Sequence, residues 1–455
     1  MCCCAGAVVV DIVIPVLVSP FDVNLLSVPC LKRYSFFNDS SSALSVRMII
    51  IRYECMERGL TYSGNKTTFF TAAFSLLSVF AASARPIPLY RQYQQIDGVT
   101  YDELSLSSVV YFVGAVTVLV IIGRLSDHFG RRNVSLISLL FSAVAMFSLL
   151  QVHSATPLLI GRLLQGLSCG LASTALAAWV VDSGRSVPGW VAPAVVSCGP
   201  MTGLPLGGMV SGALVEYGPL PRQMPLFLML LILAVCMAVS GKARETVDKK
   251  PGALASLVPQ LTLPGEAKAA FPCATVTFVC TWALGGFFQA FGPAMTSEPL
   301  HSSNAMVAAM VFASIMAPAA IGASLAGKMQ ALTAQRAGML GFALFVLFLL
   351  FTLRMHALSG FLLASVLAGI TQGMVLTGSI RTMVDKVGLK DRASVLSVIY
   401  ATSYTGTAVP TLIAGYFSSE QGLFRVATGY GVLALTGALL ILILKPKKDG
   451  VPGGQ

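Results

Sequence analysis

The chain has 455 residues, of which 55% are hydrophobic and 11% are charged. Because soluble proteins carry about 25% charged residues, this composition excludes a soluble globular protein and indicates one that lies in a bilayer. The net charge of +11 could suggest a nucleic-acid partner. We expect none, because no Lys or Arg cluster is interleaved with aromatic residues, and basic residues in membrane proteins mark cytoplasmic loops instead.

Residues 1–66 differ from the rest of the chain, since they mix Cys, Ser, Pro and Tyr with one short apolar run, 7–18, that Asp11 and Pro15 interrupt. A membrane span needs about 20 apolar residues, and no basic stretch precedes the run as in a secretory signal. We predict a segment that is disordered or a mis-assigned start, with Met56 as the initiator. Mass spectrometry of the purified N-terminus tests this, and a peptide covering residues 5–31 would refute it.

From Thr67 onward, twelve apolar runs are long enough to cross a bilayer as helices. The longest hydrophilic interruption follows the sixth run. We therefore predict an all-α membrane protein of twelve transmembrane helices in two bundles: six helices in 67–240, a cytoplasmic linker in 241–269, six helices in 270–444 and a cytoplasmic tail in 445–455. The twelve runs are 67–85, 104–123, 134–151, 157–182, 190–215, 222–240, 270–294, 303–327, 337–353, 357–380, 393–418 and 423–444.

The distribution of Lys and Arg predicts the orientation in the membrane. Eighteen of them fall in the loops and tail on one side of the helix array and five on the other. The richer side is expected to be cytoplasmic, which places both ends of the array in the cytoplasm. The five on the opposite side are Arg85, Arg91, Arg222, Arg354 and Arg425.

An internal repeat supports the division into six helices and six. Residues of the same type recur at a constant offset of 203 in the two halves. Parallel repeats of this kind are a transporter architecture, with the site between the halves near the middle of the bilayer. The recurring pairs are Gly166 and Gly369, Gly170 and Gly373, Asp182 and Asp385, Gly203 and Gly406, and Gly212 and Gly415.

Two polar features interrupt the apolar helices. The stretch GRLSDHFGRR, residues 123–132, forms a basic turn with one carboxylate between the second and third runs. Arg162 lies inside the fourth run, where a guanidinium costs at least about 2.5 kcal/mol by insertion scales. It could bind an anionic group of a substrate, influence proton movement, or simply donate to backbone carbonyls and to Gln165.

These two features carry a resemblance to a known family. The turn resembles the GxLxDxxGRR loop motif of the major facilitator superfamily (MFS), and Arg162 to Gly170 resembles its RxxQGxxxG motif. The resemblance covers about residues 67–444 and its drug and metabolite efflux branch fits best. It implies that Arg162 and Gln165 take part in proton or substrate coupling. It also implies a gating set made of Gly123, Asp127, Gly130, Arg131, Arg132 and Asp182.

Within that set, the resemblance implies that Asp127, Arg131 and Asp182 hold the two halves together when the cytoplasmic side is closed. Asp127 would accept hydrogen bonds from the N-terminus of helix eleven, whose dipole favours a carboxylate. The alternative is that these charges only anchor a loop. The matching stretch of the second half, 327–336, has Ala331 where the carboxylate should be, so we expect only one half to carry this latch.

Helix five is rich in small residues and proline, which allows close packing and a bend. It resembles the antiporter motif GxxxGPxxGG of the superfamily, with Gly208 and Ser211 in place of the motif's proline and next glycine. We interpret it as support for exchange and for a hinge in this helix. The hinge residues are Gly203, Pro205, Gly207, Gly208 and Gly212.

Polar and aromatic side chains that fall near the middle of helices are candidates for lining a substrate cavity. Aromatic faces with a few amides suit a small organic solute of mixed polarity. For each of them the alternative is simple packing between helices. They are Tyr111, Trp179, Trp282, Gln289, Gln372, Tyr400 and Tyr404.

Several function classes lack their signatures in the sequence. There is no GxxxxGK[ST] phosphate loop for ATP-driven pumping. The four histidines form no metal triad, the ten cysteines have no zinc-site spacing with histidine support, and no nucleophile stands beside a histidine inside a span. We expect no cofactor, no metal and no enzymatic activity.

The sequence favours a secondary active transporter of small organic solutes that works by alternating access, most simply a proton-coupled exporter. No Asp or Glu lies deep in a span, so no residue is assigned as the proton carrier. An uptake carrier or facilitator for a sugar or organic acid stays open, as does a non-transporting receptor or scaffold. Short loops of under about 12 residues suit a multi-pass protein of a bacterial inner membrane, with monomer as the default state.

Overall fold

A computed structural model describes residues 66–189, 191–247, 251–253, 255–257, 263–385, 387–388 and 392–444. These residues belong to one compact unit, Thr61–Gln455. The expectations for the N-terminal segment, for Met56 and for the tail after residue 444 fall outside the described residues.

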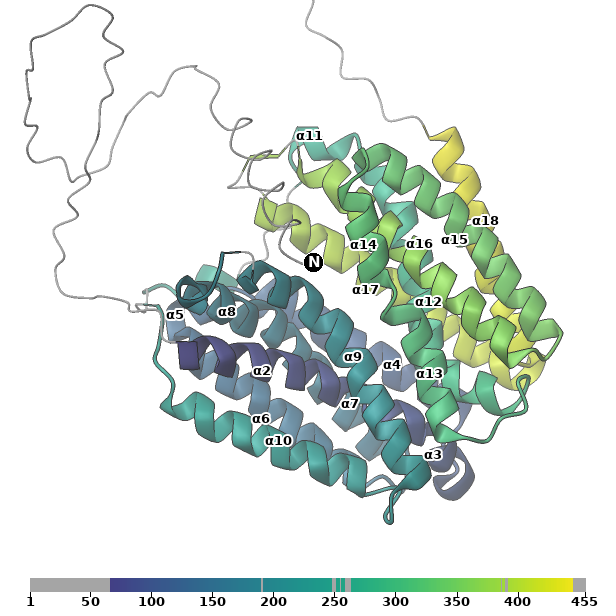
Figure 1. Ribbon diagram of the computed structural model, residues 1–455, viewed down its shortest axis with the longest axis horizontal. Coiled ribbons are helices and arrows are strands. Elements are labelled where there is room, and N and C mark those ends of the chain that lie inside the picture. The colour runs from purple at the N-terminus through teal and green to yellow at the C-terminus, as the bar shows by residue number, and fades with distance from the viewer. Residues whose placement is uncertain are drawn as a thin grey trace, which may run out of the picture. The chain divides into compact units, whose positions relative to one another are not determined.

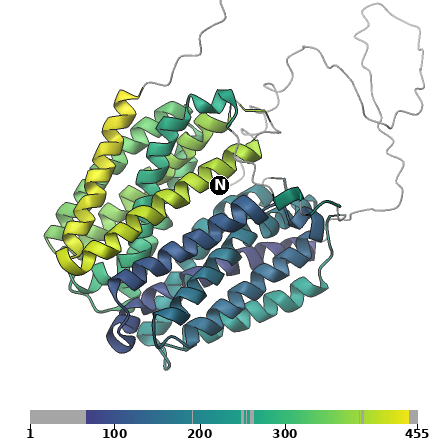
Figure 2. The same cartoon turned by 180° about the vertical axis from the view of Figure 1, so that it is seen from behind.

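The described residues are helical throughout and contain no strand. Figures 1 and 2 show the purple-to-teal helices gathered in one bundle, here the N half, and the green-to-yellow helices in another, the C half. The main helices of the N half are α2 (Lys66–Ala84), α4 (Tyr101–Thr117), α6 (Arg131–Leu150), α7 (Ala155–Leu171), α8 (Ala177–Ser183), α9 (Val191–Tyr217) and α10 (Met224–Lys242). Those of the C half are α12 (Phe271–Ser297), α13 (Ala305–Met316), α14 (Ala319–Gly327), α15 (Ala331–Arg354), α16 (Leu358–Val384), α17 (Arg392–Gln421) and α18 (Leu423–Ile443).

Among the described residues, ten helical segments are long and apolar enough to cross a membrane. Two further helices, α9 and α17, have 27 and 30 residues and occupy the positions expected for the fifth and eleventh spans. Their Gly, Pro, Ser and Thr content lowers their mean hydropathy. The all-helical membrane fold is therefore confirmed, whereas the count of twelve spans stays a prediction.

The predicted repeat corresponds to repeated packing. A Cβ on Gly166 would collide with the backbone of Tyr111 in the N half, and one on Gly369 would lie 2.5 Å from Ile315 O in the C half. Gly203 packs on α2, the first helix of its half, and Gly406 packs on Val279 of α12, the first helix of the other. The two halves are thus built on the same plan of close helix approaches.

Local sequence explains how several helices begin. Thr100 and Glu103 form a capping box at the start of α4, with Thr100 N donating to Glu103 Oε2 at 2.8 Å. Asn304 caps α13, since its Oδ1 accepts from Val307 N at 3.0 Å. Both caps lie at the end of the bundles opposite the 123–132 turn. We call the end with that turn the inner end, following the predicted topology, and the other the outer end.

Three departures from regular spans separate the structure from the sequence expectation. The predicted run 303–327 is two helices, α13 and α14, which break before Pro318 because proline cannot donate a backbone hydrogen bond. π-Helical turns extend α4 and α7, at η2 (Val118–Ile122) and η3 (Ala172–Leu176). After α2 the chain continues through a short turn, η1 (Ile87–Leu89), into an unexpected helix, α3 (Tyr90–Asp97).

Helix α3 is held at the outer end by a buried ion pair. Arg222, in the turn before α10, lies 2.6 Å from Asp97, whose side chain is 5% exposed. The same guanidinium donates to Val152 O and lies over the ring of Tyr93. These contacts fasten α3 to two loops of its own half, so it forms a fixed part of the outer surface.

Candidate functional site

The charged turn at the inner end is organised around Arg131. Its Nη2 lies 2.6 Å from Asp127 Oδ1, and its Nε donates to Asp182 Oδ2, from the end of α8, at 3.2 Å. The structure thus brings together the three residues expected to form a charge cluster. Among the described residues, Asp127 pairs with Arg131 of its own turn, and its bond to helix eleven stays a prediction.

A linker carboxylate that the sequence did not single out completes this turn. Glu245 accepts from Arg131 N at 2.9 Å and from Arg132 N at 3.1 Å, and so caps the N-terminus of α6. Gly130 makes room for it: its φ is +94°, and a Cβ there would collide with the Glu245 carboxylate. Gly123, by contrast, has ordinary helical backbone angles.

The equivalent loop of the C half, between α14 and α15, is held by the opposite arrangement. Arg381 of α16 donates from Nη1 to Ala326 O at 2.8 Å and to Met329 O at 2.9 Å. Its distance to Asp385, the repeat partner of Asp182, is 3.7 Å. In the C half a helix arginine therefore binds loop carbonyls, whereas in the N half a loop arginine binds a helix carboxylate.

Arg162 is fully buried at the centre of the N half. Its Nη1 donates to Ser83 O and to Gln165 Oε1, both at 2.8 Å, and its guanidinium lies 4.5 Å from the centre of the Tyr111 ring. Gln165 in turn donates to Ala82 O at 3.0 Å. This cluster joins α2, α4 and α7 and brings the predicted pair Arg162 and Gln165 together with Tyr111, which was selected as a cavity residue.

Aromatic rings from both halves meet beside this cluster. Tyr404 of α17 lies 4.9 Å from Trp282 of α12 and 5.9 Å from Phe112 of α4, between ring centres. Phe112 in turn lies 5.3 Å from Tyr111. Phe112 was missed because an apolar ring in an apolar helix carries no sequence signal of its own.

The other predicted cavity residues differ in their burial. Trp179 is fully buried in the apolar core of the N half, and Gln289 is buried among the core residues of α12. Gln372 of α16 is buried, with its Oε1 unpaired among the described residues. Tyr400 is 38% exposed. Of the predicted cavity set, Tyr111, Trp282 and Tyr404 are the members that the ring contacts connect, through Phe112, and their place in a substrate cavity stays a prediction.

The glycines of α9 fall on two faces with different partners. A Cβ on Gly203 would lie 2.9 Å from Leu77 O of α2, and one on Gly207 would collide with Ala81 O of the same helix. A Cβ on Gly208 would lie 3.3 Å from Phe312 of α13, and one on Gly212 would lie 2.6 Å from Ala309 of α13. Helix α9 therefore packs inside its own half on one face and across to the C half on the other.

This cross-half packing also follows the repeat. A Cβ on Gly415 of α17, the partner of Gly212, would collide with Ser105 of α4. Equivalent glycines thus seat α9 on α13 and α17 on α4. Pro205, between Gly203 and Gly207, lies inside α9 and is buried.

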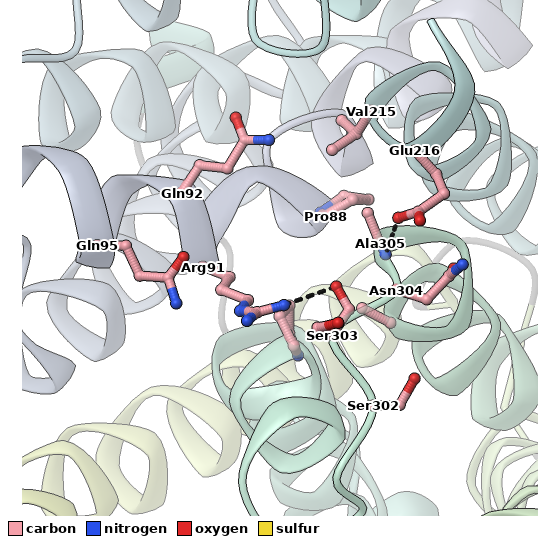
Figure 3. Close-up of a pocket in the computed structure, with 12 residues that line it drawn as sticks. Pro88, Arg91, Gln92, Gln95, Val215, Glu216, Ser302, Ser303, Asn304 and Ala305 are labelled. Carbon is pink, nitrogen blue, oxygen red and sulfur yellow. Dashed lines mark hydrogen bonds between the residues drawn. The ribbon is translucent and has the colours of Figure 1, made fainter.

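Hydrogen bonds close the outer end between the halves. Arg91 of α3 donates to Ser303 O at 2.6 Å, and Glu216 at the end of α9 accepts from Ala305 N of α13 at 2.8 Å (Figure 3). Tyr101 of α4 donates to Glu298. The first two bonds border a polar cavity of about 270 Å³. Sequence reasoning placed Arg91 on the outer side without linking it to the other half.

No group of three or more His, Cys, Asp or Glu that could hold a metal ion occurs in the part of the chain that the structure describes.

Comparison with known families decides the class of the protein. The model of the family described as "Major Facilitator Superfamily" matches residues 68–336 and 273–455 of the chain. The chain belongs to the Major Facilitator Superfamily. Its family and fold are those of membrane transporters.

Individual relatives are more distant from this MFS chain. Two curated proteins named "Multidrug resistance protein MdtL", from Klebsiella pneumoniae strains ATCC 700721 / MGH 78578 and 342, are 27% and 26% identical over 106 residues. The matched region covers 23% of this chain and 27% of each relative. The chain thus matches about a quarter of the length of these relatives.

A solved structure supports the fold. The "Crystal structure of a POT family transporter in complex with 5-aminolevulinic acid" aligns with a TM-score of 0.64 at 13% identity. The alignment covers 84% of this chain and 96% of that chain. At this level of identity the likeness concerns the fold alone.

Proposed function

We propose that the protein is a secondary active transporter that exports small organic solutes by alternating access, driven by proton exchange. The observation that carries this is the joining of two equivalent halves at their outer end through hydrogen bonds and equivalent glycine contacts. Such a joint can open while each half moves as a body, which exposes the region between the halves to one side at a time.

Export and proton exchange are supported by separate features. Gly208 and Gly212 of the antiporter-like stretch lie against α13 of the other half, where the halves must separate. Arg162, Gln165 and Tyr111 form a buried polar cluster that can respond to a charged solute or proton. The partial likeness to proteins named for multidrug resistance points in the same direction.

The same proposal includes the inner latch and the location. Asp127, Arg131 and Asp182, with Gly130 and Arg132 shaping the turn, would join the C half when the inner end closes. The excess of Lys and Arg at that end supports a cytoplasmic position for it and for both ends of the helix array. We propose a monomer in a bacterial inner membrane, with the solute, protons and the bilayer as its partners.

Flux measurements in proteoliposomes test the proposal. Labelled candidate solutes from a growth or thermal-shift screen should show counterflow, and their movement should collapse an imposed pH gradient. Uptake without an effect on the gradient would favour a facilitator for a sugar or organic acid. Saturable binding without counterflow would favour a receptor or scaffold and overturn the proposal.

A further inference from the structure

Arg85 is a second buried arginine whose environment the sequence did not foretell. It was expected to mark an outer loop, but it follows directly on α2 and is 3% exposed. Its backbone carbonyl accepts from Ser211 Oγ of α9 at 2.7 Å. Its Nε and Nη1 are buried and have no hydrogen-bond partner among the described residues.

Arg162 also has buried guanidinium nitrogens without a hydrogen-bond partner among the described residues. Only its Nη1 is paired, with Ser83 O and Gln165 Oε1, whereas Nε and Nη2 are buried without a partner in the described part of the chain. Arg162 donates to Ser83 O near the end of α2, and Arg85 follows Ser83 two residues later, so both arginines are connected to the same part of the chain. Four guanidinium nitrogens in this region therefore carry N–H groups that have no acceptor among the described residues.

No carboxylate of the described residues forms an ion pair with Arg85 or Arg162. The ion pairs of the described residues involve Arg131, Arg222, Arg381 and His153, and none involves Arg85 or Arg162. Burying an arginine without a counter-charge costs several kcal/mol, and each unpaired buried donor adds to the cost. A pair of such residues in one half indicates that the missing acceptor comes from outside the chain.

We propose that Arg85 and Arg162 bind an oxyanion group, such as a carboxylate or sulfonate, of an organic anion. This inference rests on the proposed transport function and narrows its substrate class. A guanidinium presents two donors in one plane, which matches the two oxygens of such a group. The Tyr111 ring over Arg162 and the nearby rings of Phe112 and Tyr404 provide an apolar surface for the rest of the molecule.

Arg85 also connects the anion to the outer closure. Ser211 and Gly212 are neighbours in α9: the first holds Arg85 O and the second lies on Ala309 of α13. The backbone of Arg85 is therefore fixed to α9, one of the two helices that must part when the outer end opens. Neutralising this site by an anion would remove the charge that the closed outer end now buries.

Thermal unfolding of the purified full-length protein tests the inference, using four aromatic probes at constant ionic strength in sodium chloride. Sodium benzoate and sodium benzenesulfonate should raise the Tm in a saturable manner, because a ligand that binds the folded state stabilises it. Neutral benzamide and cationic benzylammonium chloride should not. Arg85→Gln and Arg162→Gln should each weaken the apparent affinity for benzoate about tenfold or more, as expected for loss of a charge-assisted pair.

Controls separate binding from folding. Arg354→Gln removes an exposed charge at the outer end of α15 and should leave the benzoate shift unchanged. If a glutamine variant does not fold, Arg85→Lys and Arg162→Lys keep the charge and should bind benzoate more weakly than the wild type, because lysine lacks the planar fork.

Two results would overturn the inference: no Tm shift of the wild type with either anion, or equal shifts in the wild type and all Arg85 and Arg162 variants. Counterflow distinguishes this from failure of the proposed function. Transport of a neutral or cationic solute without any anion shift would retain the transporter and reject the anion site. Anion binding without flux of any solute would retain the anion site and reject the proposed transport function.

Discussion

At the scale of single residues, the inner turn depends on one backbone angle and one distant carboxylate. Gly130 adopts a φ of +94°, which residues other than glycine rarely adopt. Glu245 reaches this position from the linker, more than a hundred residues away in sequence, and caps α6. The sequence motif identified the turn, but a single glutamate in a polar linker gave no sign of this partner.

Substitution of Gly130 should destabilise the protein more than substitution of a glycine whose Cβ would lie in open space. Gly130→Ala combines backbone strain, which costs about 1–3 kcal/mol, with a collision against Glu245. Glu245→Ala should cost about 1 kcal/mol through the lost cap. Gly241→Ala is the control, because a Cβ there meets no atom within 4 Å. Equal Tm values for Gly130→Ala and Gly241→Ala would contradict this account.

The carboxylate of the turn should matter for transport rather than for folding. We expect Asp127→Asn to be expressed normally and to transport at a sharply reduced rate, because the amide weakens the bond to Arg131 and the predicted bond to helix eleven. Asp385→Asn is the matched control, since its pair with Arg381 is long and exposed and contributes little. Full-rate flux by Asp127→Asn would remove this residue from the gate.

At the scale of helices, hydropathy and glycine spacing predicted most elements, including a run at 134–151 that corresponds to α6. The π-helical turns escaped prediction because an extra residue in a turn does not alter mean hydropathy. The break at Pro318 was present in the sequence, but an unbroken apolar run concealed it. Likewise, the antiporter-like motif located the glycines of α9 but could not assign them to two faces, which depends on where α2 and α13 lie.

The two faces of α9 should respond differently to substitution. Gly207→Ala should lower the Tm, because its Cβ collides with the backbone of α2 in the same half. Gly212→Ala should instead push α9 away from α13 and open the outer end. External labelling of a cysteine introduced at Ala308, which lines the outer cavity, measures this opening. Gly327→Ala, in open space, should change neither quantity, and identical effects of all three substitutions would refute the division.

At the scale of the whole transporter fold, the closure of the outer end joins elements that no single stretch of sequence relates. Glu216 ends α9 and Ala305 begins α13, 89 residues later. A carboxylate at a helix N-terminus is favourable by about 0.3–1 kcal/mol. The repeat and the loop motif predicted two halves, whereas the groups that hold them together at this end became evident only from the structure.

Removal of this carboxylate should shift the protein towards an open outer end. For Glu216→Ala we expect up to about fivefold faster external labelling of the cysteine at position 308, as the loss of about 1 kcal/mol implies. Glu420→Ala removes an exposed carboxylate from the outer end of α17 and should leave the rate unchanged. A Glu216→Ala rate equal to that of the parent would exclude Glu216 from the closure.

The alternation of the two ends is tested most directly by distances between spin labels in the full-length protein. One pair, at Ile96 and His301, spans the outer end, and the other, at Phe129 and Lys328, spans the inner end; all four positions are exposed. On addition of a transported solute or a change of pH, we predict that one distance lengthens as the other shortens. Distances that stay fixed, or that lengthen together, would contradict the account.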